Sequence, residues 1–359
     1  MSINSDKKIL ILIPALNPEK EFERYIDLLI ENNFKNIVVV NDGSKPECQD
    51  IFENIEKKEG CQILTHEVNM GKGKALKDGL KYFFDLENKE EFSGVITVDC
   101  DGQHLVKDII EISKELENKP NSLVLGIRDL TGKNVPPKSS FGNKATSNVF
   151  RLLYGVRLKD TQTGLRGIPT KLVENFMDLT GDRYEYESNM LIECILKKIE
   201  LVEIPIETVY IDNNSGTHFR PVHDSVLIYW KILNSFIKYS AISIISCIID
   251  ILLFEVFFYV LKIQLANVLI LVSTILARII SSLVNFGLNK KIAFKSNKKV
   301  KNTIIKYYIL CITQMLISGL AVSGIYAITN VSEVIIKIIV DTILFFINYR
   351  VQRIFIFDK

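Results

Sequence analysis

The chain has few cysteines and little net charge, and each of these shortages excludes a class of protein. Its six cysteines are scattered with no Cys-x-x-Cys pair, which excludes the common zinc spacings and predicts reduced thiols in a cytosolic compartment. The formal net charge is only +2, so no global basic field argues for nucleic acid as a partner. The length of 359 residues suits two domains better than one.

Short apolar runs alternate with helical patterns in the first part of the chain. Strands are expected over about 9–13, 36–40, 62–65, 95–98, 122–128 and 203–210, and helices between the first four of them. This alternation predicts a right-handed, mostly parallel α/β sheet that is covered on both faces.

Two carboxylates follow the expected strand over 95–98. Asp99 and Asp101 are two residues apart, so on an extended backbone their side chains share one face. Ligands of an open α/β sheet bind at the carboxyl ends of its strands. Two acidic oxygen donors there can hold a divalent cation, which in turn neutralises a diphosphate. An Asp-Gly turn that merely ends a strand is the alternative, so the interpretation depends on the neighbouring loops.

Other strands also end in loops of small polar residues. Asp42, after the second strand, could accept hydrogen bonds from a base or a ribose. The stretch 69–74 offers glycine amides and Lys72 to phosphates. Each loop taken singly is an ordinary turn. The Gly-x-Gly here lacks the dinucleotide fingerprint and follows the wrong strand, which excludes a Rossmann dehydrogenase.

Taken in order, four motifs resemble a family-2 glycosyltransferase of the polyprenyl-phosphate or dolichyl-phosphate sugar synthase type. The motifs are Pro14-Ala15-x-Asn17, Asn41-Asp42-Gly43-Ser44, Asn69-x-Gly71-Lys72-Gly73 and Asp99-x-Asp101-x-Gln103. The resemblance spans about 8–235 and implies an α/β, Rossmann-like GT-A nucleotide-sugar domain. The chain departs from the family where Leu16-Asn17-Pro18-Glu19 replaces the usual Tyr-Asn-Glu, and where Asn41 replaces an aspartate.

The resemblance also implies the residues of a donor site and of a metal site. The nucleotide-sugar would be bound by Pro14, Ala15, Asn17, Glu19, Asp42, Gly71, Lys72, Asp99, Gln162 and Arg220. Mg²⁺ or Mn²⁺ would be held by Asp99, Asp101 and Gln103. The metal would stabilise the negative charge that develops on the departing nucleoside diphosphate.

Besides Asp101, the resemblance implies three cationic residues at the reaction centre. Arg128 and Lys138 match the positions thought to hold the acceptor phosphate, in a basic, loop-rich segment, and Arg166 lies beside the donor diphosphate in relatives. A lipid phosphate is already ionised near neutral pH, so the reaction needs cations that position it more than a general base. Basic residues that only solubilise a loop are the alternative. The acidic residues of 184–187 could orient sugar hydroxyls or cap the next helix.

The composition changes abruptly near Ile237. Apolar runs over about 238–261, 265–288, 304–328 and 332–350 are each near the ~20 residues that span a membrane. Lysines crowd the loop after the second run, so the catalytic half and both termini of this multi-pass cell-membrane protein are expected in the cytoplasm. The expected domains are 1–221, an interfacial amphipathic linker helix over 222–236, and a membrane domain over 237–359.

The membrane half contains an internal repeat. Residues 285–294 parallel 348–357, and 237–239 parallel 305–307, which indicates a helical hairpin duplicated in the same orientation. This half resembles the GtrA-like membrane domain. Asp250, Arg278 and Asp341 are expected near mid-membrane, where charges must pair or face a cavity. Asp250 and Arg278 are the predicted pair.

Together these observations predict an inverting, metal-dependent transferase. It would move a hexose from a nucleotide donor, UDP-glucose in preference to GDP-mannose, to a polyprenyl phosphate, giving a polyprenyl-phosphate sugar. The sequence leaves open whether the chain forms a homo-oligomer. One alternative is a lipid-linked sugar transporter, or flippase, whose soluble half senses nucleotide-sugar. Another is a processive polysaccharide synthase, although the Gln-x-x-Arg-Trp motif of that class is missing.

Overall fold

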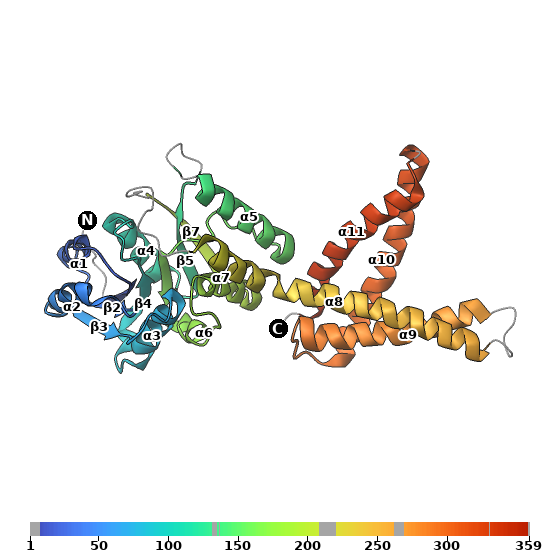
Figure 1. The fold of residues 1–359 in the computed structure, drawn as a ribbon, viewed down its shortest axis with the longest axis horizontal. Helices are drawn as coiled ribbons and strands as arrows, with labels where there is room; N and C mark the ends of the chain where they lie inside the picture. The colour runs from blue at the N-terminus through green and yellow to red at the C-terminus, as the bar shows by residue number, and fades with distance from the viewer. Residues whose placement is uncertain are drawn as a thin grey trace. The chain divides into compact units, whose positions relative to one another are not determined.

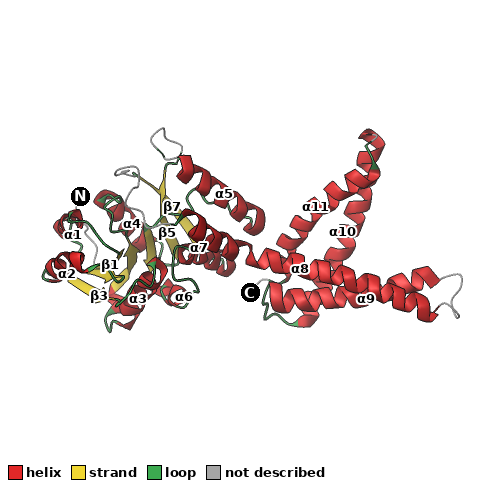
Figure 2. Ribbon diagram, in the orientation of Figure 1, coloured by secondary structure: helices red, strands yellow, loops and turns green. Residues whose placement is uncertain are grey.

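The computed structural model describes residues 8–130, 135, 137–207, 220–261, 269–329 and 331–357. The chain divides into two compact units, Met1–Arg151 with Val156–Ile232 and Leu152–Gly155 with Leu233–Lys359. The first unit is built from helices and strands and the second from helices (Figures 1 and 2). Each unit is described by itself below.

The first unit contains a sheet of seven strands. The strands are β1 (Lys8–Ala15), β2 (Ile37–Asn41), β3 (Cys61–Thr65), β4 (Phe92–Thr97), β5 (Ser122–Arg128), β6 (Arg166–Pro169) and β7 (Glu200–Ile206). Their order is β3-β2-β1-β4-β6-β5-β7. Neighbouring strands are parallel except at β6, which is antiparallel to both β4 and β5. The predicted mostly parallel α/β sheet is therefore confirmed.

Helices cover both faces of this sheet. They are α1 (Glu21–Glu31), α2 (Gln49–Glu56), α3 (Lys72–Asp85), α4 (Val106–Asn118), α5 (Pro137–Tyr154), α6 (Glu174–Met177) and α7 (Glu185–Lys197). Ile9, Ile11 and Ile13 alternate along β1 and pack with α1, α2 and α4. Leu12 points to the other face, where a Cβ added to Gly79 of α3 would lie 2.1 Å from its Cδ1. A side chain at this position would have to displace the Leu12 side chain, so glycine favours the close approach of α3 to the sheet.

The polar loops predicted from the sequence meet at one edge of the sheet. Strand β1 pairs in parallel with β2 and with β4, with Ala15 opposite Asn41 and Leu12 opposite Thr97. Parallel strands place their carboxyl ends on the same side, so the segments after β1, β2 and β4 emerge together.

Helix α5 differs from the expectation for its segment. The sequence predicts a loop through Pro137 and Gly142 to Lys144, whereas the structure has a helix of 18 residues. A proline at the first helical position costs no hydrogen bond, because the N–H there has no partner within the helix. Asn143 and Phe150 are buried and lie two turns apart, so tertiary packing selects the helix.

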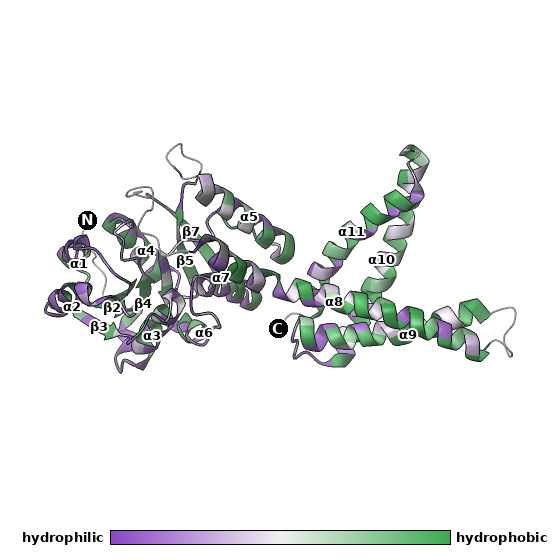
Figure 3. Ribbon diagram, in the orientation of Figure 1, coloured by the Kyte–Doolittle hydropathy of each residue, from purple (hydrophilic) through white to green (hydrophobic). Residues whose placement is uncertain are grey.

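The second unit consists of α9 (Leu269–Leu288), α10 (Val300–Thr329), α11 (Glu333–Val351), and the part of α8 (Pro221–Leu261) that follows Ile232. Short π-helical turns, η5 (Asn289–Ala293) and η6 (Gln352–Ile356), follow α9 and α11. Apolar residues predominate along these helices (Figure 3). Among the described residues, three helical segments are long and apolar enough to cross a membrane: His223–Leu261, Leu269–Ala293 and Val300–Thr329.

Two segments of this part differ in detail from the expected boundaries. Helix α8 is continuous over both the expected linker, 222–236, and the first apolar run. Helix α11 occupies the fourth apolar run, and it carries Glu333, Lys337, Asp341 and Arg350. The predicted pair within the apolar helices is confirmed, because Arg278 Nη2 lies 3.1 Å from Asp250 Oδ2.

Candidate active site

A cleft of about 160 Å³ lies at the carboxyl edge of β1, β2 and β4. It is lined by Pro14, Ala15, Leu16, Asp42, Asn69, Gly71, Lys72, Asp99, Cys100, Asp101, Arg183 and Tyr184. Seven of the residues predicted for the donor and metal sites lie together here: Pro14, Ala15, Asp42, Gly71, Lys72, Asp99 and Asp101.

The glycine loop before α3 has room for no side chain. Gly71 has a φ of +102°, and a Cβ added to it would lie 2.3 Å from the carbonyl oxygen of Asp182. A Cβ on Gly73 would lie 2.6 Å from that of Tyr186. The loop and the first turn of α3 are therefore pressed against the segment before α7, and both segments line the same cleft.

Asp42 holds this loop in place. Its Oδ1 accepts a hydrogen bond from the Met70 N–H and its Oδ2 accepts one from the Gly71 N–H, each at 2.8 Å. The Nδ1 atom of His66 also lies 2.8 Å from Oδ1. The sequence predicts that Asp42 accepts hydrogen bonds from a base or ribose, but the chain itself already uses both carboxylate oxygens. The structure thus adds an anchoring role to Asp42, and His66 is a partner that no sequence pattern indicated.

Lys72 joins two carboxylates across the cleft. Its Nζ lies 2.7 Å from Asp99 Oδ1 and 3.1 Å from Glu187 Oε1. Burial lowers the pKa of Lys72, but the charges of Asp99 and Glu187 outweigh it and hold that pKa above its usual value. Burial likewise raises the pKa of Asp99, and Lys72 and His104 outweigh it, so the pKa of Asp99 lies below its usual range. At neutral pH the lysine is charged and Asp99 is ionised.

Glu185 and Glu187 take different roles. Glu185 Oε1 accepts a hydrogen bond from the Asp182 N–H at 3.1 Å, in the turn that precedes α7, and the N-cap residue Tyr184 makes no side-chain capping hydrogen bond. Glu187 contacts Lys72 in the cleft instead. The Lys72 ammonium also lies 5.8 Å from the centre of the Tyr184 ring.

Asp101 lies beside Asp99 in the turn after β4. Desolvation in the cleft and then the negative charge of Asp99 raise the pKa of Asp101 above its usual value. Its Oδ1 accepts a hydrogen bond from the Gln103 N–H at 3.1 Å. Gln103 is not among the residues that line the cleft, so its place in a metal shell stays a prediction.

The paired carboxylates fit a divalent cation. Two oxygen donors lie at the end of one strand, and the pKa of one of them, Asp101, is raised by desolvation and then by the charge of Asp99, so a dication would stabilise the pair. Within the described residues no three His, Cys, Asp or Glu side chains are grouped to hold a metal by themselves. Mg²⁺ commonly takes one or two carboxylates and completes its shell with substrate phosphates and water.

The turn from Asp160 to Gly164 packs against the carboxylate of Asp99. A Cβ on Gly164 would lie 2.3 Å from Asp99 Oδ2, and Thr97 Oγ1 donates to the Gly164 carbonyl at 2.7 Å. His104 Nε2 lies 3.3 Å from the same Oδ2. Gly164 and His104 thus contact one oxygen of the Asp99 carboxylate, while Lys72 contacts the other in the cleft.

Arg128 is held by a buried aspartate. Its Nε lies 2.7 Å from Asp160 Oδ2 and its Nη2 lies 3.1 Å from Oδ1, which is a two-point ion pair. Asp160 is fully buried. This fixes the guanidinium at the end of β5, while contact with an acceptor phosphate stays a prediction. The side chain of Lys138, the other residue predicted for this role, lies outside the described residues.

Arg166 differs from its predicted place beside the donor diphosphate. It lies on β6 and is only 1% exposed. Its Nη1 donates to the Glu187 carbonyl at 2.7 Å and its Nε to the Thr163 carbonyl at 3.0 Å. The strand turns this side chain into the interior, so in this structure it holds the backbone behind Glu187 and does not line the cleft.

The remaining predicted donor-site residues also lie outside the cleft lining. Asn17 accepts from the Lys45 N–H through Oδ1 at 2.8 Å, and its own N–H donates to Ser44 Oγ at 2.9 Å, which ties two edge loops together. Glu19 and Gln162 are exposed. Arg220 is exposed too, and the segment 215–219 before it lies outside the described residues. Their roles toward a donor stay predictions.

Arg183 is a lining residue that sequence reasoning missed. Its Nε lies 3.0 Å from Oδ1 of Asp224, a fully buried residue in the first turn of α8. Asp224 also accepts from the Arg220 N–H at 2.7 Å. The pair links residues 41 positions apart, so no local pattern could have indicated it.

Residues 10–166 match the sequence profile of glycosyl transferase family 2, and residues 238–357 match that of the GtrA/DPMS transmembrane domain. A protein of Methanocaldococcus jannaschii is 34% identical over 212 residues, which cover 58% of this chain and 84% of the relative. A UDP-N-acetylglucosamine–dolichyl-phosphate N-acetylglucosaminyltransferase of Methanococcus voltae is 31% identical over 223 residues, which cover 57% of this chain and 87% of the relative.

Among solved structures, glucosyl-3-phosphoglycerate synthase from Mycobacterium tuberculosis in complex with Mn²⁺, uridine diphosphate and phosphoglyceric acid aligns at 16% identity. The alignment has a TM-score of 0.47 and covers 64% of this chain and 78% of that one.

The sheet, its polar edge and the match over 10–166 define a glycosyltransferase domain of the GT-A type, followed by a helical membrane domain. The chain belongs to glycosyl transferase family 2 and carries a C-terminal GtrA/DPMS transmembrane domain. The predicted family is thus confirmed.

Proposed function

We propose that the protein transfers a sugar from a UDP-sugar to a polyprenyl phosphate at the cytoplasmic face of a membrane, with inversion at the anomeric carbon. The observation that carries this proposal is the cleft in which Asp99, Asp101 and Lys72 surround one small space. The Methanococcus voltae relative, which is named for transfer from a UDP-sugar to dolichyl phosphate, supports the choice of donor and acceptor.

The donor half of the reaction follows from the cleft. A bound Mg²⁺ or Mn²⁺ would supply positive charge to the diphosphate as it leaves. Asp99 and Asp101 would hold that cation, in the cleft beside the start of α3. Lys72 provides a second positive charge within the same space. These groups stabilise the negative charge that the nucleoside diphosphate gains as its bond to the sugar breaks.

The acceptor half needs positioning and little acid–base chemistry. A phosphate oxygen of the lipid attacks the anomeric carbon from the face opposite the leaving diphosphate, so one bond forms as the other breaks. The acceptor is already an anion, so no proton has to be removed. Arg128, whose guanidinium Asp160 fixes in a single orientation, is the residue we assign to the acceptor phosphate, together with Lys138.

We further propose that α8 to α11 all span the membrane, with both termini and the transferase domain in the cytoplasm. Lysines between α9 and α10 and the arginines at the end of α11 support this orientation. The four spans would anchor the transferase domain to the membrane that contains the lipid acceptor.

The test is a transfer assay with the purified full-length protein, Mn²⁺ and polyprenyl phosphate. Labelled UDP-glucose, UDP-N-acetylglucosamine and GDP-mannose are supplied separately. We expect chloroform-soluble label from one UDP-sugar, and its loss when the metal is chelated. No lipid product from any donor would overturn the proposal and favour the lipid-linked sugar transporter.

A further inference from the structure

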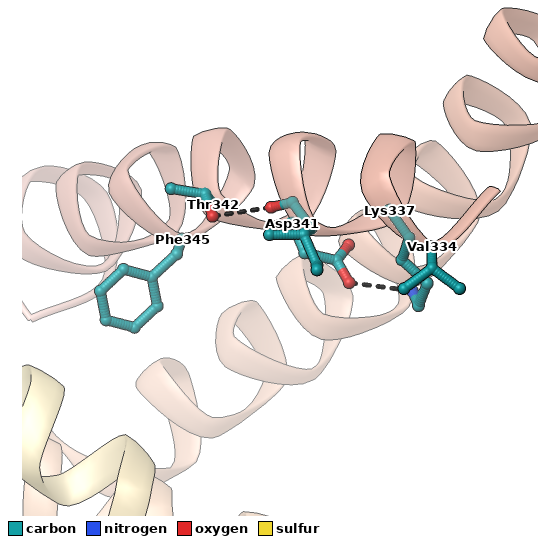
Figure 4. A pocket seen from close by; sticks show the side chains of 6 residues that line it. Val334, Lys337, Asp341, Thr342 and Phe345 are labelled. Carbon is teal, nitrogen blue, oxygen red and sulfur yellow. Dashed lines mark hydrogen bonds and ion pairs between the residues drawn. The ribbon is translucent and has the colours of Figure 1, made fainter. Parts of the chain in front are cut away.

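Two groups of charged side chains do not enter the transfer steps described above. On α11, Lys337 Nζ lies 2.8 Å from Asp341 Oδ2 beside a hollow of that helix (Figure 4), so these two charges balance each other one turn apart. The second group lies at the carboxyl edge of the sheet, where His66 stands between the carboxylates of Asp42 and Asp78. Of the two groups, this one reaches the candidate active site, because Asp42 lines the cleft.

Both ring nitrogens of His66 face a carboxylate. Nδ1 lies 2.8 Å from Asp42 Oδ1, and Nε2 lies 3.0 Å from Asp78 Oδ2. The side chains of His66 and Asp42 are 10% and 4% exposed, so little water competes for the first of these contacts. Because an ionised carboxylate only accepts hydrogen bonds, contact with both carboxylates requires an N–H on each ring nitrogen.

These three residues come from segments that are adjacent only in the folded chain. Asp42 follows β2, His66 follows β3, and Asp78 lies within α3. Lys74 Nζ lies 2.6 Å from Asp78 Oδ1, so the outer carboxylate has a cation of its own on the same helix. A continuous row of polar contacts therefore runs from Lys74 through Asp78 and His66 to the carboxylate in the cleft.

The contact with His66 decides which oxygen of Asp42 is left for a ligand. An ionised carboxylate has about four acceptor positions, two on each oxygen. Oδ1 accepts from the Met70 N–H and also faces His66 Nδ1, so both of its positions are used. Oδ2 accepts from the Gly71 N–H at 2.8 Å and has no second donor among the residues that the structure describes. One acceptor position on Oδ2 therefore remains in the cleft.

We propose that His66 is a positioning residue of the donor site, which holds Asp42 so that the remaining acceptor position of Oδ2 meets an N–H or O–H of the donor nucleoside. The two loop donors, Met70 and Gly71, are neighbours in the chain, and His66 supplies a third point of attachment from a different segment. The histidine acts through Asp42 and does not touch the substrate. This inference rests on the proposed function, because it requires a nucleotide in the cleft.

The surrounding backbone does not depend on the imidazole ring. The His66 N–H donates to the Asn41 carbonyl at 2.9 Å, and every residue except proline keeps that donor. A Cβ added to Gly43 would lie 2.3 Å from the carbonyl carbon of Val68, so the segments after β2 and β3 pack directly against each other. Substitution of the ring should therefore change the Asp42 side chain more than it changes the fold.

Two amide substitutions separate the two contacts of the ring. His66→Asn carries its amide nitrogen as many bonds from the backbone as Nδ1, so it can donate to Asp42 but is too short for Asp78. His66→Gln carries its amide nitrogen as far out as Nε2, so it reaches Asp78 in place of Asp42. Both variants remove the ring and its titratable group, so they differ only in which carboxylate keeps a donor.

UDP binding to the full-length protein in the presence of Mn²⁺ is measured by isothermal titration calorimetry. We expect the affinity for UDP to fall about tenfold in His66→Gln and to stay within about threefold of the wild type in His66→Asn. In steady-state kinetics the KM for the UDP-sugar should rise in His66→Gln, while kcat and the KM for polyprenyl phosphate change little. Glu67→Gln, an exposed change in the same loop, is the control and should bind UDP like the wild type.

Melting temperatures of the two variants distinguish positioning from stability alone. If the ring only stabilises the fold, the UDP affinities of the two variants follow their melting temperatures and show no preference for asparagine. UDP affinity that is equal in the two variants, or weaker in His66→Asn, would overturn the inference. A wild type that binds no UDP would overturn the proposed donor and this inference together, whereas UDP binding without transfer to lipid would overturn the proposed function alone.

Discussion

The ammonium of Lys72 lies 2.7 Å from Asp99 Oδ1, in the cleft at the carboxyl edge of the sheet. The lysine opens α3 and the aspartate follows β4, so the contact joins two loops of the sheet edge. It keeps Asp99 ionised in a cleft where burial alone would favour the neutral acid.

The first prediction concerns stability and pH. The pKa of Asp99 is lowered, so the stability it contributes is present above its unfolded value near pH 4 and is lost only as the pH falls through the lowered folded value. Lys72→Met removes the cation and leaves two carboxylates facing each other. We expect a loss of about 3 kcal/mol at pH 7 that shrinks toward pH 4, as protonation removes the repulsion.

Melting temperatures of the full chain between pH 4 and pH 8 check this expectation. Lys81→Met, on the exposed side of the same helix, is the matched control and should melt like the wild type at each pH. A Lys72→Met protein that is equally destabilised at pH 4 and pH 7 would show that repulsion between the two carboxylates does not contribute to the loss.

The second prediction concerns the metal. Asp101→Ala removes one of two oxygen donors, and we expect Mn²⁺ affinity to fall by roughly a hundredfold and transfer to be abolished, while membrane insertion stays intact. Electron paramagnetic resonance of free Mn²⁺ measures the binding without reference to activity. Asp85→Ala, exposed at the end of α3, should bind metal normally. Retained transfer by the Asp101 variant would refute the metal assignment.

The third prediction concerns the support behind Asp99. The Cβ introduced by Gly164→Ala would lie 2.3 Å from the present position of Asp99 Oδ2, so the carboxylate must move. We expect a cost of about 1–3 kcal/mol and weaker Mn²⁺ binding. Gly142→Ala is the control, because the nearest atom to its added Cβ is 3.8 Å away and alanine favours the helix. Equal metal binding by both variants would contradict the packing argument.

The fourth prediction tests whether Arg128 binds the acceptor phosphate or the nucleotide-sugar donor. Arg128→Lys keeps the charge but loses the planar fork that pairs with Asp160 at two points. We expect the KM for polyprenyl phosphate to rise about tenfold, while the KM for the nucleotide-sugar changes little. About tenfold is the order of magnitude for the loss of one charge-assisted contact. Steady-state kinetics with each substrate varied in turn measures both. The exposed Arg24→Lys serves as control, and a rise confined to the donor KM would reassign Arg128.

The sequence by itself determined the sheet, its polar edge and the membrane half. The strand over 95–98, the aspartates after it and the apolar runs after 237 are local patterns, and apolar periodicity and strand direction suffice to place them. The apolar runs also sufficed to pair Asp250 with Arg278, since the two residues lie at similar depth on adjacent helices.

Only the tertiary structure decided which of those residues face the cleft. It turned Arg166 into the interior on β6, engaged Asp42 with His66 and the glycine loop, and formed α5 where a loop was expected. It also joined Lys72 to Glu187, far apart in the chain. These outcomes depend on packing and hydrogen bonds between distant segments, and local propensity contains no information about them.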